Sequence, residues 1–304
     1  MPSTPQSLTA RLYAAPVLLL TLTALMWAGN TIASQVAKGE ISPMTLILVR
    51  WIAVTAIMWP LFGAEVRAAW PTVRHRLGWM ILVATLGFTG FNALFYYAAL
   101  STSAVNMGIL QGAIPVVVLI GAYLAYRTPV TPAQGLGVLA TMVGVALVAA
   151  RGDLSVLLGL ALNAGDLLML AAATVYALYA VALRARPEMS GGAFFTMLTP
   201  IAALTAMPLA AIEWATLGFF WPTPTGWGVA AFVTIFPSCL AQLFFLRGVD
   251  LIGPGRAGVY VNLVPVFAPL LAVVLLGQTF ALYHAIALCL VLGGIWLAQR
   301  TGRA

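Results

Sequence analysis

Long runs of apolar residues, separated by short polar connections, fill almost the whole chain. Within each run the hydrophobic positions are continuous rather than alternating, which argues against the strands of a membrane barrel. A helix needs about 20 mostly apolar residues to cross a bilayer. Ten runs have about this length: 16–37, 43–62, 77–100, 103–126, 131–150, 163–184, 191–212, 225–247, 255–276 and 281–299. The pattern therefore predicts an all-α integral membrane protein with ten transmembrane helices.

The pattern also repeats along the chain. A shift of 150 positions pairs identical or similar residues: Gly108 with Gly258, Pro115 with Pro265, and Asn92 with Gln242. Such self-similarity indicates an internal duplication, with five helices in residues 1–150 and five in residues 151–304. Because five is odd, the second repeat would enter the membrane from the opposite face. Inverted repeats are typical of secondary transporters, in which two similar halves open a central site to each side alternately.

Each repeat carries a proline near the middle of its fourth helix, Pro115 or Pro265. Proline lacks an N–H and clashes with the carbonyl four residues earlier, so the carbonyls of Gln111 and Val261 lose their usual partners. In hydrocarbon this is tolerable only where protein or a wet cavity satisfies those carbonyls. We therefore expect these two helices to line a central pathway.

Composition and charge agree with a membrane protein. The chain is 62% hydrophobic and 7% charged, with a mean hydropathy of +1.04, whereas a soluble domain has about 25% charged residues. The net charge of +7 reflects the loops rather than a nucleic-acid partner. With the N-terminus inside, eleven arginines fall on the cytoplasmic side, against Lys38 and Arg151 outside. This asymmetry predicts cytoplasmic termini, and we expect a location in a bacterial-type inner membrane.

Several short motifs carry a family resemblance. They are Leu25-Met26-Trp27-Ala28-Gly29-Asn30, then Pro43 and Arg50, the paired Gly108/Pro115 and Gly258/Pro265, Gly144 and Gly294, Gly165-Asp166-Leu167, and Ala177-Leu178-Tyr179. In this order the chain resembles the drug/metabolite transporter superfamily, EamA type, over nearly its whole length. The resemblance implies two five-helix repeats and transport of small organic solutes, including amino acids. Members often carry Glu just after the ninth helix, where this chain has Gln278, so no role of that acid carries over.

Arg50 is the one charge well inside a predicted helix, about seven residues from its start. An arginine at this depth should face protein, carbonyls or water. It could contact an anion or carboxylate. It could instead be a structural residue that bonds loop carbonyls or reaches toward the outer interface. We favour the structural role, because the second helix is expected at the periphery.

Acidic residues are absent from the middle of every predicted helix, since Asp166, Glu213 and Asp250 lie near helix ends. Proton-coupled efflux of cations usually needs a carboxylate deep in the site. We therefore expect facilitative or exchange transport by alternating access.

Polar and aromatic side chains on the helices expected to line the pathway are candidate substrate contacts. They are Trp27, Asn30, Asn92, Tyr96, Gln111, Tyr179, Gln242 and Tyr260. Uncharged amides suit neutral or zwitterionic solutes, and an aromatic cavity suits apolar and aromatic amino acids. Alternatively, Asn92 and Gln242 bond neighbouring helices and the aromatic rings only pack. Gly108, Gly112, Pro115, Gly258 and Pro265 are candidate packing or hinge residues, and we favour packing because GxxxG spacing allows close helix contact.

We expect a transporter rather than an enzyme, with a small-molecule substrate and the lipid bilayer as its partners. The two histidines are isolated and on opposite sides of the membrane, so neither a metal site nor a catalytic dyad is predicted, and no cofactor is expected. An exporter of aromatic or apolar amino acids fits the residues above. A permease for lipophilic drugs or metabolites, or a membrane receptor or structural protein without transport, stays open. The sequence does not predict the oligomeric state.

Overall fold

The computed structural model of the chain describes residues 14–127, 129–153, 155 and 163–300, and for 254–256 and 298–300 only the backbone. The described residues form helices and short connections, and none of them lies in a strand, which confirms the all-α prediction. The helices of the first half are α2 (Pro16–Val36), α3 (Pro43–Val73), α4 (Leu77–Ala84), α5 (Phe91–Ser101), α6 (Ala104–Leu110), α7 (Ile114–Tyr126) and α8 (Pro132–Ala149). Those of the second half are α10 (Ala164–Ala182), α11 (Gly191–Leu217), α12 (Pro224–Val233), α13 (Ala241–Ile252), α14 (Pro254–Tyr260), α15 (Val264–Leu276) and α16 (Leu282–Arg300).

Eight helical stretches of the described chain are long and apolar enough to cross a membrane, and Leu282–Leu297 is a shorter apolar helix. One stretch, Pro43–Ser101, is 59 residues long and covers two of the predicted spans. It exceeds the predicted end at residue 62, because α3 continues to Val73 and includes Pro71, which was wrongly expected in a connection. The helix tolerates this proline because the freed carbonyl belongs to Arg67, an exposed residue that water can reach.

The two halves share local irregularities at a spacing of 150 residues. A 3-10 turn, η3 (Gln111–Ala113) or η6 (Val261–Leu263), precedes each mid-helix proline. In each turn the N–H of the residue before the proline binds the carbonyl that the proline leaves free, Ile114 to Gln111 and Val264 to Val261. The two carbonyls therefore keep partners within their own helices.

A π-helical segment occurs in each half as well. These segments are η2 (Thr85–Gly90), between α4 and α5, and η5 (Thr234–Leu240), between α12 and α13. A π-helix widens the turn and is frequent at functional sites. Both segments reach the centre of the bundle.

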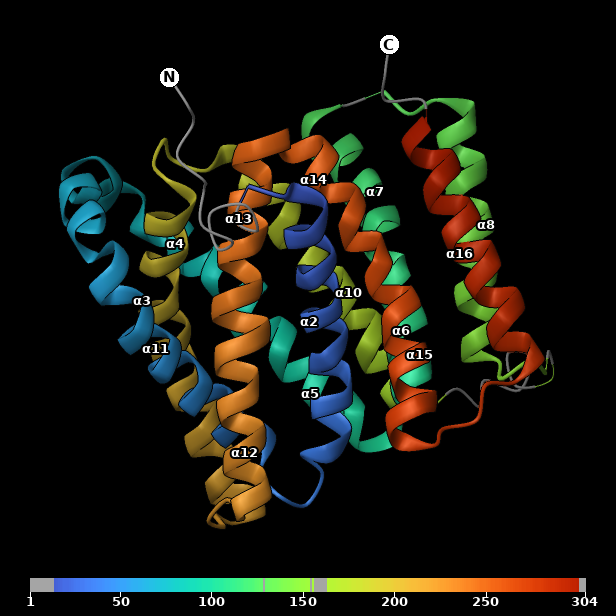
Figure 1. Cartoon of the computed structure of the whole chain (residues 1–304), viewed down its shortest axis with the longest axis horizontal. Coiled ribbons are helices and arrows are strands. Elements are labelled where there is room, and N and C mark those ends of the chain that lie inside the picture. The colour runs from blue at the N-terminus through green and yellow to red at the C-terminus, as the bar shows by residue number, and fades with distance from the viewer. Residues whose placement is uncertain (1–13, 128, 154, 156–162, 301–304) are drawn as a thin grey trace, which may run out of the picture.

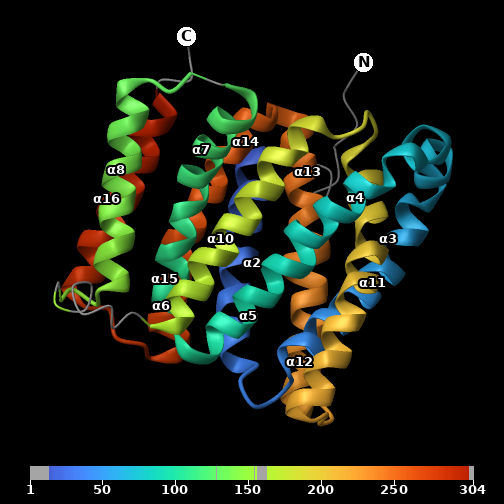
Figure 2. The same cartoon turned by 180° about the vertical axis from the view of Figure 1, so that it is seen from behind.

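Helices of the two halves pack pairwise against one another (Figures 1 and 2). Helix α3 lies along α11, α8 along α16, and α10 against α5 and α7, while α2 packs on α13 and α15. The α8–α16 pair stands at one edge of the bundle in both views. Helix α2 begins and α16 ends at the same end of the bundle (Figure 1).

Close helix approach explains several glycines. A Cβ on Gly294 of α16 would lie 2.4 Å from the Gly137 carbonyl oxygen of α8, a distance that no side chain allows. A Cβ on Gly108 would lie 2.7 Å from the Ala268 Cβ, and one on Gly112 would lie 2.2 Å from Val291 Cγ1. The glycine pair of the predicted GxxxG motif therefore makes tight contacts with α15 and α16.

Candidate functional site

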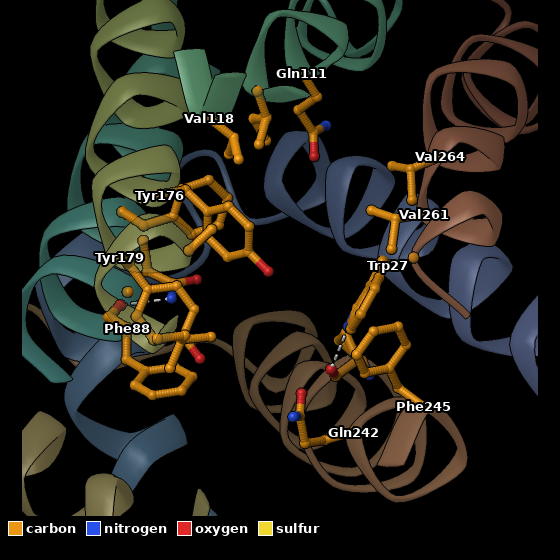
Figure 3. A pocket seen from close by; sticks show the side chains of 18 of the residues that line it. Trp27, Phe88, Gln111, Val118, Tyr176, Tyr179, Gln242, Phe245, Val261 and Val264 are labelled. Carbon is orange, nitrogen blue, oxygen red and sulfur yellow. Dashed lines mark hydrogen bonds between the residues drawn. The ribbon is translucent and has the colours of Figure 1, made fainter. Parts of the chain in front are cut away.

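A cavity of about 700 Å³ lies between the two halves in the middle of the bundle (Figure 3). Its volume is within the range of small-molecule sites. Both π-helical segments, both mid-helix prolines and aromatic residues from several helices form its walls. Among the described residues that line it there is no aspartate or glutamate. Arginine is the only charged residue type on the described wall, as Arg50 in the centre and Arg186 at the edge.

Arg50 is 6% exposed and is held by three neutral oxygens. Its Nε donates to Ser238 Oγ at 2.7 Å, and its Nη1 donates to Asn92 Oδ1 at 2.9 Å and to Tyr96 Oη at 3.1 Å. The expectation of a peripheral arginine that bonds loop carbonyls was therefore wrong. Helix α3 is not peripheral at this level, because α11 and η5 pack against it. The other terminal nitrogen, Nη2, has no acceptor among the described residues and is not sealed from the cavity.

Asn92 and Gln242, predicted as equivalent positions, differ in what they bind. Both ends of the Asn92 amide are occupied, since Oδ1 accepts from Arg50 and Nδ2 donates to the Phe88 carbonyl at 2.6 Å. Gln242 lines the cavity and its amide points into it (Figure 3). Its amide has no hydrogen-bond partner in the described part of the chain. Asn92 therefore positions Arg50, whereas Gln242 is open to a bound solute.

Tyr96 and Tyr260 do not line the cavity, although both were predicted substrate contacts. Tyr96 is 3% exposed and lies behind Arg50, where its hydroxyl donates to Asn30 Oδ1 at 2.8 Å. Arg50 fills the space in front of this ring, since its Nη1 donates to the Tyr96 hydroxyl. Tyr260 is half-buried outside the cavity. Trp27, Asn30, Gln111 and Tyr179, by contrast, all lie on the wall.

Aromatic rings make two facing walls (Figure 3). On one side, Trp27 Nε1 donates to the Pro237 carbonyl at 3.1 Å and its ring lies 5.4 Å from that of Phe245. On the other side, the Tyr176 and Tyr179 rings are 5.4 Å apart, and Figure 3 shows them across the cavity from Trp27. A solute with an apolar or aromatic side chain can pack between these walls.

Gln111 contributes a half-occupied amide to the wall between these two sides. Its Nε2 donates to the Met107 carbonyl at 3.2 Å and to Thr31 Oγ1 at 3.4 Å. Its Oε1 has no donor among the described residues and remains available as an acceptor.

The wall also includes residues that were not among the predicted contacts, and three of them are Trp51, Ser238 and Asn262. Arg50 lies over the ring of Trp51, with its Cζ 5.1 Å from the ring centroid. Ser238 follows Pro237 inside η5. A serine beside a mid-helix proline could have suggested that its hydroxyl binds nearby polar groups, which here are Arg50 Nε and the Val233 carbonyl. Asn262 follows Val261 in η6, so the break before Pro265 could have drawn attention to it.

Within the described part of the chain, the cavity wall includes an exposed residue at one end of the bundle. The wall extends past Leu183 to Arg186, which is exposed just after α10. We call this the mouth end. The opposite end, where α10 and α16 begin, contributes no residue to the described wall. We call it the closed end.

A polar cluster joins four helices at the closed end. Asp166 of α10, only 1% exposed, accepts hydrogen bonds from Thr102 Oγ1 and from Asn106 Nδ2 at 3.2 Å. Asn106 Oδ1 in turn contacts His284 Nε2 at 3.1 Å. Because His284 Nδ1 accepts the Ala281 N–H at 3.0 Å, Nε2 carries the proton and donates to Asn106. The cluster is thus a continuous chain of bonds that ends on one carboxylate.

Gln278 adds a further contact at the closed end. Its Oε1 accepts the N–H of Val105, at the start of α6, at 3.2 Å. The residue that departs from the family pattern therefore binds the first turn of α6 as a neutral acceptor.

Comparisons with known proteins agree with this architecture. Residues 14–150 and again residues 163–299 match the EamA-like transporter family. The uncharacterized transporter YyaM of Bacillus subtilis is 28% identical over 228 residues, which cover 72% of each chain. An uncharacterized transporter of Archaeoglobus fulgidus is 25% identical over 288 residues, 92% of this chain and 96% of the relative. A protein of known crystal structure has the same fold, with a TM-score of 0.64 at 20% identity over 93% of this chain and 96% of that chain.

Proposed function

This chain belongs to the EamA-like transporter family of membrane transporters, and on that premise we propose that it exports apolar and aromatic amino acids. The observation that carries the proposal is Arg50, a buried cation on a cavity wall without any described carboxylate. A buried charge is costly unless it is paired. The three protein oxygens around Arg50 are neutral and leave Nη2 free, so a solute carboxylate supplies the missing negative charge.

The rest of the cavity suits the remainder of an amino acid. Trp27, Phe245, Tyr176 and Tyr179 form apolar surfaces on two sides, which accept a side chain of the same character. The amide of Gln242 provides both a donor and an acceptor at the edge of this space. Size, aromatic walls and a single cation together favour a monocarboxylate of amino-acid size over a phosphate ester, which would call for several cations.

Transport in this proposal follows alternating access. Residues 1–150 and 151–304 act as two inverted five-helix repeats, and the shape described here is open at the mouth end. With the arginine-rich connections and both termini in the cytoplasm of a bacterial-type inner membrane, that shape faces inward. No carboxylate lines the described cavity, so the solute does not exchange there for a proton and its own gradient drives export.

A second candidate is efflux of lipophilic metabolites or drugs. It rests on the large aromatic share of the wall, which would accept a neutral ring system without any use of Arg50. The two candidates differ in one requirement, because only the amino-acid exporter needs a carboxylate on the solute.

Counterflow in proteoliposomes tests the proposal. Liposomes preloaded with single unlabelled amino acids should accelerate uptake of radiolabelled phenylalanine or leucine, and protein-free liposomes should not. Gln242→Ala should slow this exchange, because it removes a free amide from the wall, while Gln134→Ala, in the capping box of α8, serves as the matched control. Exchange of uncharged aromatic compounds without exchange of any amino acid would favour the second candidate.

A further inference from the structure

Tyr96 connects Arg50 to Asn30 behind the cavity wall. The Tyr96 oxygen lies 3.1 Å from Arg50 Nη1 and 2.8 Å from Asn30 Oδ1. Arginine has only donors, so the tyrosine oxygen accepts from Arg50 and its single proton goes to Asn30. This assignment fixes the Asn30 amide with its oxygen toward Tyr96 and its nitrogen away from it.

The Asn30 amide nitrogen is thereby a second donor toward the cavity. Asn30 lines the cavity, and its Nδ2 has no acceptor within the described chain and is not sealed from solvent. Since both Arg50 Nη1 and Asn30 Oδ1 contact the same hydroxyl, these two atoms are at most about 6 Å apart. The free nitrogens Nη2 and Nδ2 sit on these same two groups, so one carboxylate with N–H···O bonds of about 2.9 Å to both would bridge them.

Arg50 is fixed in place before a solute arrives. Ser238 from η5 holds Nε, and Asn92 from α5 holds Nη1, with the Asn92 amide itself tied to the Phe88 carbonyl. A donor pair whose rotamers are already set loses little entropy on binding. The contacts on Arg50 therefore come from both halves of the chain and hold its guanidinium group in one orientation.

The described residues of the cavity wall offer no comparable site for an ammonium group. The described wall has no aspartate or glutamate, and Arg50 and Arg186 make its potential positive. Aromatic faces and the amides of Gln242 and Gln111 are the groups left for a cation, and they are neutral.

We propose that Arg50, Asn30 and Tyr96 form a carboxylate seat, and that the cavity recognises its solute by the carboxylate and not by the amino group. This rests on the proposed function only in taking the cavity as the solute site. It extends the substrate class to aryl and alkyl monocarboxylates with a hydroxyl, an oxo group or hydrogen in place of the amine. Tyr96 is a positioning residue in this seat, because it contacts Asn30 and Arg50 rather than the solute.

Binding to the purified protein in nanodiscs, measured by titration calorimetry, tests the seat without any transport. Phenylalanine and 3-phenylpropionate should bind with dissociation constants within about threefold of each other. Phenethylamine, which lacks the carboxylate, should bind at least about tenfold more weakly, the effect of one hydrogen bond to a charged group. Phenethylamine binding as tightly as 3-phenylpropionate would overturn the seat.

Variants separate positioning from folding. Tyr96→Phe keeps the ring but frees the Asn30 amide, so it should raise the dissociation constant of 3-phenylpropionate about tenfold and leave that of neutral 3-phenylpropanol unchanged. Tyr97→Phe is the control, because that neighbouring hydroxyl binds Glu213 at 2.6 Å instead. Equal effects of the two variants, or equal losses of affinity for the acid and the alcohol, would contradict the positioning of Asn30 and Arg50 by Tyr96.

The outcomes also distinguish the two proposals. Carboxylate binding without amino-acid exchange in liposomes would refute export and keep the seat. Amino-acid exchange with no binding of 3-phenylpropionate would refute the seat and keep export. Failure of every compound to bind a folded protein would refute both.

Discussion

Removing the Asp166 carboxylate should open the closed end. In Asp166→Ala the Thr102 hydroxyl and the Asn106 amide lose their common acceptor, and both are buried. The bonds link α5 and α6 to α10, and Asn106 passes the link on to His284 of α16. The proposed alternating access requires these helices to separate whenever the closed end opens, so weaker bonds should favour the open shape.

The magnitude follows from the groups left unpaired. A buried donor without an acceptor costs about 1–3 kcal/mol, and side-chain hydrogen bonds in membrane proteins average about 0.6 kcal/mol. Two lost bonds therefore weaken the closed end by about 1–4 kcal/mol. Because 1.4 kcal/mol is a factor of ten, the open population should rise about fivefold at the lower bound and by more than tenfold over most of this range.

Thiol accessibility measures this opening. Cys239 and Cys289, both free, are first replaced by alanine, and Ala104→Cys places a thiol at a fully buried position at the start of α6. A membrane-impermeant maleimide should label this thiol about tenfold faster in the Asp166→Ala background. Asp153→Ala is the control, since that exposed carboxylate binds only Ser155 among the described residues. Equal labelling rates for the two aspartate variants, with both proteins folded, would show that the Asp166 cluster does not stabilise the closed end.

Three further predictions concern packing, the cavity wall and orientation. Gly294→Ala should lower the free energy of unfolding by about 1–3 kcal/mol, because the new Cβ would meet the backbone of α8. Gly293→Ala should not destabilise the protein, because a Cβ there would have open space around it. Chemical denaturation of the two variants checks this difference. Gly87→Ala would place a Cβ 2.4 Å from the Tyr179 ring, so it should displace that ring into the cavity and weaken solute binding at least about tenfold. Gly258→Ala should not weaken binding, because this glycine is also on the wall but has open space around it. Titration calorimetry compares the two variants. A C-terminal fusion to green fluorescent protein should be fluorescent, and a C-terminal fusion to alkaline phosphatase should be inactive. The reverse pattern would contradict a cytoplasmic C-terminus.

The sequence was informative wherever one residue type has a strong local effect. Continuous apolar runs predicted the helices, and the shared spacing of Pro115 and Pro265 predicted breaks that recur as 3-10 turns in both halves. Helix ends were less predictable. Proline at position 71 looked like a breaker, yet the helix continues past it because the freed carbonyl lies in an exposed turn.

Roles that depend on packing could not be read from the chain. Arg50 was expected at the periphery, because nothing local shows that α11 and η5 enclose α3. Asn92 and Tyr96 are four residues apart and therefore share one face of a helix, but this spacing could not show that Arg50 would fill the space in front of the Tyr96 ring. The equivalence of Asn92 and Gln242 held in position and not in bonding, because only Asn92 has an arginine beside it.

The central claim is that the free side of Arg50 binds the carboxylate of the transported solute. Its most direct test is the concentration dependence of phenylalanine exchange in liposomes that contain the wild type, Arg50→Gln or Arg76→Gln. Arg76→Gln is the control, because Arg76 is an exposed arginine that binds the Ala185 carbonyl outside the cavity. Arg50→Gln should raise the half-saturating concentration at least about tenfold, because a charge-assisted bond is lost, whereas Arg76→Gln should match the wild type. Exchange by Arg50→Gln with an unchanged half-saturating concentration would contradict this claim.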